Sequence, residues 1–360
     1  MKVKFLFLCK RYYTNKDLIA DKFGRLFHLP LQLVKNGHQG LVVAADYRNK
    51  KSEILEIANF SFYSIPFALL WPFSFLFKMY RLFRQCQPDI VIASGDSHFG
   101  AIGLLLAKIA KIPFVFDVYD HYASFGTNKV PGMKSLYYLA LRKADLVVCA
   151  SIPLSHFVRK YNQSVIVIEN GVDISLFKPI DKQQARVRLG IPNDRVIVGF
   201  FGSIDKNRGI ETLIEAGKIL RYTYPSLQLL LAGKLGISIN LEKPWIDYRG
   251  VVQQKEVVLL INACDVVIIP YLPDSQVELS NACKIAEYLA CGQPVVTTRV
   301  ANYADIFATA PDAVCEPGDP IDMAHTILAQ IQAQKVVEFP KNLTWEQLGK
   351  KLSQALLTII

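Results

Sequence analysis

The sequence lacks the motifs that most directly identify a metal or redox site. Its seven cysteines are scattered, without CxxC pairs or CxxH runs, so neither a zinc site nor a disulfide framework is indicated, and a reducing compartment such as the cytoplasm is favoured. There is no DxD motif and no His/Cys cluster spaced to hold a metal, and only six histidines occur in 360 residues. Low-complexity tracts are scarce, which argues against a largely disordered chain.

Long uncharged runs are also scarce, and the one that occurs bears on membrane association. Residues 57–77, IANFSFYSIPFALLWPFSFLF, are long enough to span a bilayer. They contain Pro66, Pro72 and several polar residues, and they fit the repeating pattern of the chain when they form a strand, a turn and a helix. The alternatives are a transmembrane span and an apolar surface that leans on a membrane, helped by the basic KMYRLFR segment. The N-terminal MKVKFLFLCKRYY resembles a signal peptide in charge, but its apolar run is too short and no cleavage site follows, so we expect a first buried strand.

Acidic residues are few in the first half of the chain. Residues 1–180 hold 23 Lys and Arg against 12 Asp and Glu, and the remainder holds 18 against 19, so the net charge of +10 lies almost wholly in the first half. A basic half indicates an anionic partner, such as a phospholipid surface, a phosphorylated intermediate or a nucleic acid. The alternative is a generally basic solvated surface.

Short apolar runs alternate with helical patterns along most of the chain. Nearly continuous apolar runs are typical of parallel strands covered on both faces, so we predict an α/β fold of two Rossmann-like, doubly wound domains facing a central cleft. The pattern restarts after ENGVDISLFKP, which suggests domains at 1–175 and 176–342 and a C-terminal helix at 343–360 that packs back towards the first domain. The predicted strands are VKFLFLC, GLVVAA, FSFYSI, DIVIAS, FVFDVY, LVVCAS and VIVIEN in the first half, and RVIVGFFG, LQLLLAG, DVVIIP, PVVTT and AVCEP in the second.

Two segments of the second half favour an anionic ligand. In VGFFGSIDKNRGIETLIEA a strand ends at Gly202, and Arg208 stands just before a helix whose amino end can hold a phosphate. The glycines follow neither GxGxxG nor a P-loop, so an ordinary strand–loop–helix turn is the alternative.

In the helix of KIAEYLACGQPVV, capped by Ser280 or Asn281, Lys284 and Glu287 lie one turn apart. They form either a structural ion pair or a site in which Lys284 binds phosphate and Glu287 accepts hydrogen bonds from two adjacent hydroxyls, as in a ribose.

These segments, with NGVDISLFKP, LLLAG, YRGVV and CDVVIIPY, follow one another in an order that resembles nucleotide-sugar glycosyltransferases of family 4, which have the GT-B fold. The likeness covers nearly all of the second half, whereas the first half matches in layout, best at LVKNGHQGLVVAA. It implies a donor-nucleotide site that includes Glu287 at the ribose, with Lys284 and Arg208, and the residues Gly202, Ser203, Ser280, Asn281 and Val251. It also implies retention of anomeric configuration and no bound metal or other cofactor. Ser203 stands where many members have Arg, and Leu279 where many have a Glu that contacts the sugar; Glu278 is one residue off.

The first domain is then expected to supply the acceptor side. VFDVYDHYASF ends a strand with Asp120 and His121, either of which can act as general base or stabilise charge at the transferred carbon. A helix cap or loop salt bridge is the alternative for Asp120, and a structural interface role for His121. Asp96 and His98 follow another strand, where they either contact the acceptor or cap the following helix. Lys10 and Arg11, together with Lys16, lie in a basic loop after the first strand, where they meet an anionic ligand or face solvent.

We therefore expect a retaining hexosyltransferase that moves a sugar from a UDP- or GDP-sugar to a saccharide or lipid-linked acceptor of cell-envelope or exported polysaccharide. It would be cytoplasmic, with peripheral contact between its first domain and the inner face of an anionic membrane. The alternatives are a non-catalytic nucleotide-sugar or glycan-binding protein and a GT-B sugar-nucleotide epimerase. A nucleic-acid partner is not expected, because no recognised motif supports one.

Overall fold

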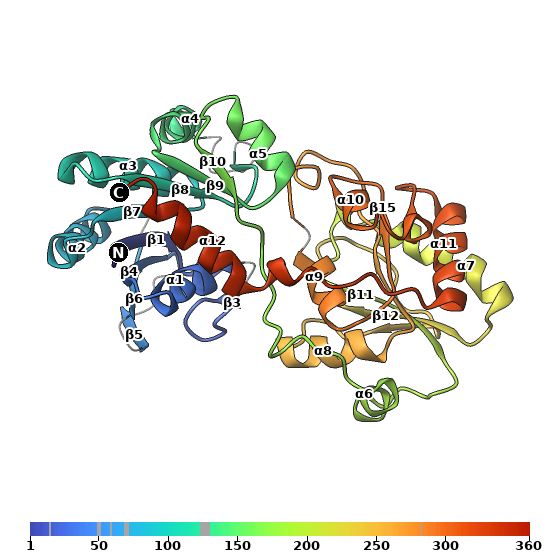
Figure 1. The fold of residues 1–360 in the computed structure, drawn as a ribbon. Coiled ribbons are helices and arrows are strands. Elements are labelled where there is room, and N and C mark those ends of the chain that lie inside the picture. Colours follow the sequence, from blue (N-terminus) through green and yellow to red (C-terminus); the bar gives the residue numbers. More distant parts are fainter. Residues whose placement is uncertain (14–15, 49–51, 58–59, 68–71, 123–129, 282) are drawn as a thin grey trace. The chain divides into compact units, whose positions relative to one another are not determined.

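A computed structural model describes residues 1–13, 16–48, 52–57, 60–67, 72–122, 130–281 and 283–360 of the chain (Figure 1). The chain forms two compact units. The first comprises Met1–Gly171, Leu279–Asn281 and Asn342–Ile360, and the second comprises Val172–Glu278 and Ala282–Lys341.

The first unit is built on an eight-stranded sheet with the order β10-β9-β8-β7-β1-β4-β6-β5. All neighbours pair in parallel except β5, which is antiparallel to β6 at the edge. The seven strands predicted for the first half are confirmed, and β5 was not predicted. The strands are β1 (Lys4–Lys10), β4 (Gln39–Asp46), β5 (Glu53–Ile57), β6 (Phe60–Pro66), β7 (Ile90–Ser94), β8 (Phe114–Val118), β9 (Leu146–Cys149) and β10 (Val165–Val167), and a small ribbon pairs β2 (Tyr12–Tyr13) with β3 (Lys16–Asp17).

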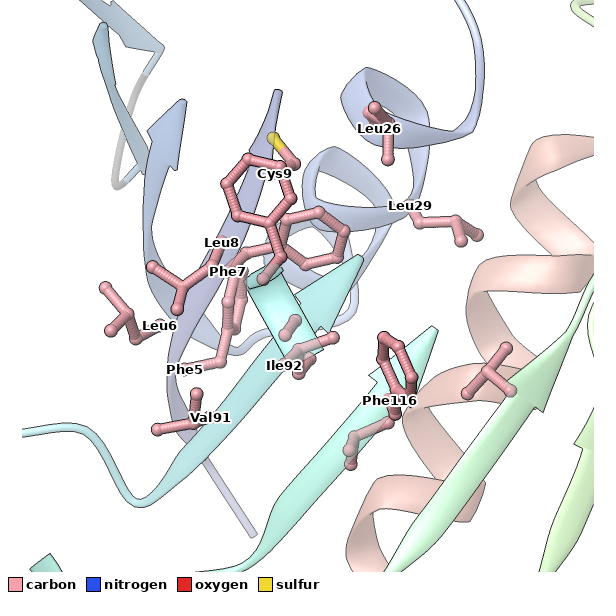
Figure 2. Packing of buried hydrophobic residues seen from close by; sticks show 14 of the residues in the cluster. Phe5, Leu6, Phe7, Leu8, Cys9, Leu26, Leu29, Val91, Ile92 and Phe116 are labelled. Atoms are coloured by element: carbon pink, nitrogen blue, oxygen red, sulfur yellow. The ribbon is translucent and has the colours of Figure 1, made fainter. Parts of the chain in front are cut away.

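Continuous apolar strands place the core of this unit on both faces of the sheet. Phe5 to Cys9 of β1 are all buried, with alternate side chains directed to opposite faces. Figure 2 shows these residues beside Val91 and Ile92 of β7 and Leu26 and Leu29 of α1. A central parallel strand that is apolar at every position needs helices on both faces, and the fold provides them.

In the described part of the first unit, six helices cover the sheet. The last of them, α12, packs on α1, where Gly349 lies so close to Gln32 that an added Cβ would come within 2.3 Å of the Gln32 Cβ. The Trp345 indole stacks on the His28 ring at 4.9 Å. The helices are α1 (Arg25–Lys35), α2 (Pro72–Cys86), α3 (Ser97–Ala110), α4 (Met133–Lys143), α5 (Ile152–Arg159) and α12 (Trp345–Leu357).

The second unit has a six-stranded parallel sheet with the order β13-β12-β11-β14-β15-β16. The five predicted strands are confirmed, and β13 was not predicted. The strands are β11 (Val196–Phe201), β12 (Leu227–Ala232), β13 (Ile246–Tyr248), β14 (Val266–Ile269), β15 (Val295–Thr298) and β16 (Val314–Cys315). The helices are α6 (Lys182–Leu189), α7 (Ile210–Thr223), α8 (Gln254–Ala263), α9 (Cys283–Ala290), α10 (Tyr303–Ile306) and α11 (Pro320–Ala333). Two doubly wound parallel sheets confirm the predicted fold class.

The uncharged stretch 57–77 contributes a strand and the first turns of a helix. Strand β6 begins at Phe60 and α2 begins at Pro72, while residues 58–59 and 68–71 lie outside the described part. Within the described ranges, no helix is long and apolar enough to cross a membrane. The prediction of a strand followed by a helix is therefore confirmed.

Candidate functional site

The best-defined candidate site lies at the carboxyl edge of the second sheet. Strands β12, β11 and β14 are neighbours, and each ends there in a loop. The loop after β11 approaches its neighbours so closely that two positions require glycine. A Cβ on Gly209, whose φ is 64°, would come within 1.7 Å of the Pro270 carbonyl oxygen, and one on Gly233, whose φ is 146°, within 1.8 Å of the Gly202 carbonyl oxygen.

Two cations meet at one aromatic ring in this site. Arg208 ends a 3₁₀ turn (Lys206–Arg208), and its guanidinium carbon lies 4.3 Å from the centroid of the buried Tyr271 ring. The Lys284 ammonium donates a hydrogen bond to the Tyr271 hydroxyl at 3.1 Å. Its aliphatic chain crosses Gly202, where an added Cβ would come within 2.2 Å of the Lys284 Cε. The Tyr271 side chain therefore holds Arg208 and Lys284 on the same site, a role that was not predicted for it.

The polar atoms of this cluster are not all satisfied within the protein. The Arg208 Nε is buried and has no hydrogen-bond partner among the described residues. Burial lowers the pKa of Lys284, but the Tyr271 hydroxyl and the Cys283 thiol outweigh it, so the net shift is upward and the side chain is cationic at neutral pH. A buried N–H donor without an acceptor is costly, and a ligand oxygen would satisfy it.

The Glu287 carboxylate is half-buried one helical turn after Lys284, on α9. Burial raises its pKa to about 7, and the attraction of Lys284 offsets only part of that shift. Among the described residues, no ion pair joins Lys284 to Glu287, and no hydrogen bond to the Glu287 carboxylate is formed. The alternative of a structural ion pair between these two residues is therefore wrong, because the ammonium turns to Tyr271 instead.

The remaining residues predicted for the donor site differ in burial and belong to both units. Ser203 is half-buried in the loop after β11, and Val251 is 70% exposed after Gly250. Ser280 and Asn281 belong to the first unit, in which the Asn281 amide donates to the Glu169 carboxylate at 3.3 Å. Residue 282, just before α9, lies outside the described part, so the cap of this helix stays a prediction.

Leu279 and Glu278 occupy different surroundings. The Leu279 side chain packs against the core of the first unit, and its carbonyl accepts a hydrogen bond from the Ser151 hydroxyl at 2.7 Å. The Glu278 carboxylate belongs to the second unit and accepts from the backbone amide of Ala301 at 3.0 Å. A carboxylate is thus present one position before the one that the resemblance implies.

In the first unit, Asp120 and His121 follow the end of β8. The Asp120 carboxylate accepts from the His121 backbone amide at 2.8 Å, and both residues are half-buried. The His121 ring meets Phe157 edge to face at 4.9 Å. Burial and the nearby Lys134 lower the pKa of His121, so its imidazole is neutral at pH 7 and able to accept a proton.

Asp117, in the same segment, serves the core instead. It is buried and forms an ion pair at 2.6 Å with Arg25, the first residue of α1. Arg25 also donates to the Ile168 carbonyl at 3.0 Å, and the Ser94 hydroxyl donates to Asp117. This buried network joins α1 to the carboxyl ends of β7 and β8.

The predicted acceptor-side residues separate into two groups. Lys10, at the end of β1, lies 3.6 Å from the Asp96 carboxylate, which precedes α3, and His98 contacts the Tyr47 hydroxyl. These residues gather at the carboxyl edge of the first sheet. Asp96 occupies the cap position of α3, but its side chain accepts no capping hydrogen bond.

Arg11 does not join this group. It is 3% exposed, and its guanidinium binds Asp17 at 2.8 Å, Asp46 at 3.6 Å and also Glu53. The prediction that Arg11 lies in a basic loop open to a ligand is therefore wrong. Three carboxylates enclose its guanidinium: Asp17 on the partner strand of the small ribbon, Asp46 at the end of β4 and Glu53 at the start of β5.

Comparisons with known proteins identify the family of the chain. The profile of Glycosyltransferase Family 4 matches residues 26–176, and that of Glycosyl transferases group 1 matches residues 195–333. The chain is 24% identical to the capsular polysaccharide biosynthesis glycosyltransferase CapM of Staphylococcus aureus, over 85% of this chain and 87% of that protein. It is 23% identical to the putative teichuronic acid biosynthesis glycosyltransferase TuaC of Bacillus subtilis, over 84% and 78% of the two chains.

The solved structure of Anabaena HepE in complex with UDP-glucose has the same fold, with a TM-score of 0.72, 18% identity, and coverage of 99% of this chain and 100% of that one. Fold and comparisons together define the protein as a glycosyltransferase with the GT-B fold. Within that class, the chain belongs to the family 4 type, as the ordered motifs of its second half predict.

Proposed function

We propose that this glycosyltransferase takes its sugar from a nucleoside diphosphate sugar, a UDP- or GDP-sugar, bound by the second unit. The observation that carries the proposal is the pair of cations, Arg208 and Lys284, gathered on Tyr271 at the amino end of α9. Arg208 and Lys284 supply the charge and the N–H donors that a diphosphate accepts. Glu287 lies one turn further, its carboxylate accepts no hydrogen bond from the described residues, and it accepts from the two ribose hydroxyls. HepE, which shares the fold, is described in complex with UDP-glucose.

Transfer breaks the bond between the anomeric carbon and the diphosphate oxygen and forms a bond to an acceptor hydroxyl, which loses its proton. We propose that configuration is retained, with Asp120 stabilising the positive charge that develops at the anomeric carbon and His121 accepting the proton. Lys10, Asp96 and His98 contribute hydrogen bonds and charge to the acceptor. The names of CapM and TuaC favour a saccharide or lipid-linked acceptor in the synthesis of an envelope polysaccharide.

The direct test compares Arg208→Gln with Lys206→Gln, since Lys206 lies in the same turn but is exposed. Thermal unfolding is measured with UDP, GDP, ADP and their sugars. A ligand that binds only the folded protein raises the midpoint by mass action. We expect one nucleotide family to raise it in wild type and in Lys206→Gln, and to have little effect in Arg208→Gln. Absence of any shift in folded wild type would contradict the proposal.

Two other functions predict different outcomes with the same ligands. An epimerase would convert the donor sugar without an acceptor, whereas a non-catalytic binding protein would bind it and transfer nothing to any acceptor extract. Replacement of the usual Arg by Ser203 and of the usual Glu by Leu279 favours the non-catalytic binding protein. Transfer of a radiolabelled sugar to a membrane extract, lost in Asp120→Asn, separates both from the transferase.

A further inference from the structure

Helix α2 exposes aromatic side chains on the face that points away from its sheet. Phe75, Met79 and Phe83 are buried against the sheet, as the helical period requires. Phe73 and Phe77, one turn apart, are nevertheless 74% and 69% exposed. Monomeric proteins expose single apolar residues widely, but two adjacent exposed phenylalanines on one stripe need an explanation.

The two following helices repeat the feature. On α3, Leu105 is 58% exposed and Ile109, one turn later, is 53% exposed. On α4, Leu136 and Leu139 are 39% and 40% exposed and share one face. Each of the three helices therefore carries a pair of exposed apolar residues at helical spacing.

The topology places these three helices on the same face of the first sheet. The connections from β6 to β7, from β7 to β8 and from β8 to β9 all run in one direction across the strand order, and right-handed crossovers then put α2, α3 and α4 on one side. Helix α1 connects β1 to β4 in the opposite direction, so it lies on the other side with α12 (Figure 1). Both α2 and α3 contact β1, and α4 packs on α3.

Charge on this three-helix face has a single sign. Neither α2 nor α3 nor α4 contains an Asp or a Glu. All basic residues of these helices are exposed and lie among the exposed apolar ones: Lys78, Arg81, Arg84, Lys108, Lys134, Arg142 and Lys143.

We propose that the three-helix face docks on the surface of an anionic lipid bilayer. Basic side chains attract anionic headgroups at about 1 kcal/mol each, which corresponds to about a five-fold change in partitioning, and the exposed apolar residues insert among the acyl chains. A nucleic acid would use the charge but not the aliphatic side chains. A second copy of this chain would bring equally basic helices together and so be repelled. The inference extends the lipid-linked acceptor of the proposed function, but it does not require a donor and can be tested without one.

The test is sedimentation of the full chain with vesicles of phosphatidylcholine alone or with about a third phosphatidylglycerol. We expect binding to the anionic vesicles that weakens as salt rises from 50 to 500 mM. Replacing Lys78, Arg81 and Arg84 by Gln should lower the partition coefficient on the order of 100-fold at low salt. Replacing Phe73 and Phe77 by Ser should lower it at both salt concentrations, because insertion is not screened.

Matched controls come from the second unit. Replacing Arg188, Arg195 and Lys255 by Gln changes the net charge equally at exposed positions, and Val187→Ser with Tyr222→Ser removes equally exposed apolar groups. Both controls should bind vesicles as wild type does.

The proposal is overturned if the full chain stays in the supernatant at low salt, or if the control variants lose as much binding as the face variants. Dimerisation lost with Phe73→Ser and Phe77→Ser, without vesicle binding, would overturn it in favour of self-association. Nucleotide-induced stabilisation, measured on the same variants, should be unchanged, so a failure here leaves the donor site untouched.

Discussion

Replacement of Glu287 by Gln should stabilise the protein without ligand while it abolishes stabilisation by the nucleotide. The carboxylate has a pKa near 7 in the folded protein, against 4.5 when it is unperturbed, because burial disfavours its charged form. Between these pH values the folded state binds more protons than the unfolded state, so stability falls as the pH rises from 4.5 through 7. The full shift corresponds to about 3 kcal/mol, and partial exposure of the side chain to solvent brings the expected gain from Gln to about 2 kcal/mol at pH 8.

The assay is urea unfolding of wild type and Glu287→Gln at pH 4.5 and pH 8, with Glu242→Gln, an exposed carboxylate of the same unit, as the control. We expect equal stability at pH 4.5, a more stable variant at pH 8, and no pH-dependent difference for the control. Titration with the nucleotide at pH 7.5 should then stabilise only wild type and the control. A variant that is less stable than wild type at pH 8 would refute the reasoning, because it would mean that the carboxylate serves the fold.

The remaining predictions concern three other positions. Arg25→Ala leaves the buried Asp117 unpaired and should cost about 3–5 kcal/mol in urea unfolding, with much of the loss recovered when Asp117 is replaced by Leu in the same chain; an unchanged midpoint would contradict the buried pair. Gly202→Ala displaces the Lys284 side chain rather than the backbone, so calorimetry should detect weaker nucleotide binding with unfolding nearly unchanged. Burial lowers the pKa of His38, so protonation of this residue favours the unfolded state below pH 6.5. The free energy of unfolding should therefore fall less steeply with decreasing pH in His38→Gln than in wild type, and equal slopes would show that His38 does not contribute to acid unfolding.

The sequence predicts the strands that are mainly apolar and misses those that are very short or mostly exposed. All twelve predicted strands were confirmed, since a mainly apolar run such as LQLLLA favours burial on both faces of a sheet. Strand β5, EILEI, is mostly exposed at the sheet edge, and β13 has only three residues, so neither carries a strong pattern. Helix α6, between the two units, was not predicted; it forms because Asp181 caps it and Arg186 pairs with Asp265 at 2.8 Å.

Spacing along the chain was enough to name the candidate residues that the structure brings together in the second unit, but not the contacts that depend on residues distant in the sequence. Arg208 and Lys284 were recognised because each precedes or begins a helix after a strand. Tyr271 was not recognised. An aromatic residue just after β14, which neighbours β11 in the sheet, could have indicated that it lines the same site. Arg11 and Arg25 were misjudged or overlooked because their carboxylate partners come from other strands, and no local pattern distinguishes a buried arginine from an exposed one.

The return of α12 to the first unit affects how the chain folds during synthesis. Domains usually fold in the order in which they leave the ribosome. Here α1 ends at Lys35 and its packing partner begins at Trp345, so the whole second unit is made before the first can be completed. Until then, the surface of α1 around His28 and Gln32 is open to solvent and to chaperones. Every residue of the second unit, which ends at Lys341, is therefore made before α12, so the second unit is the one that can reach its native packing first.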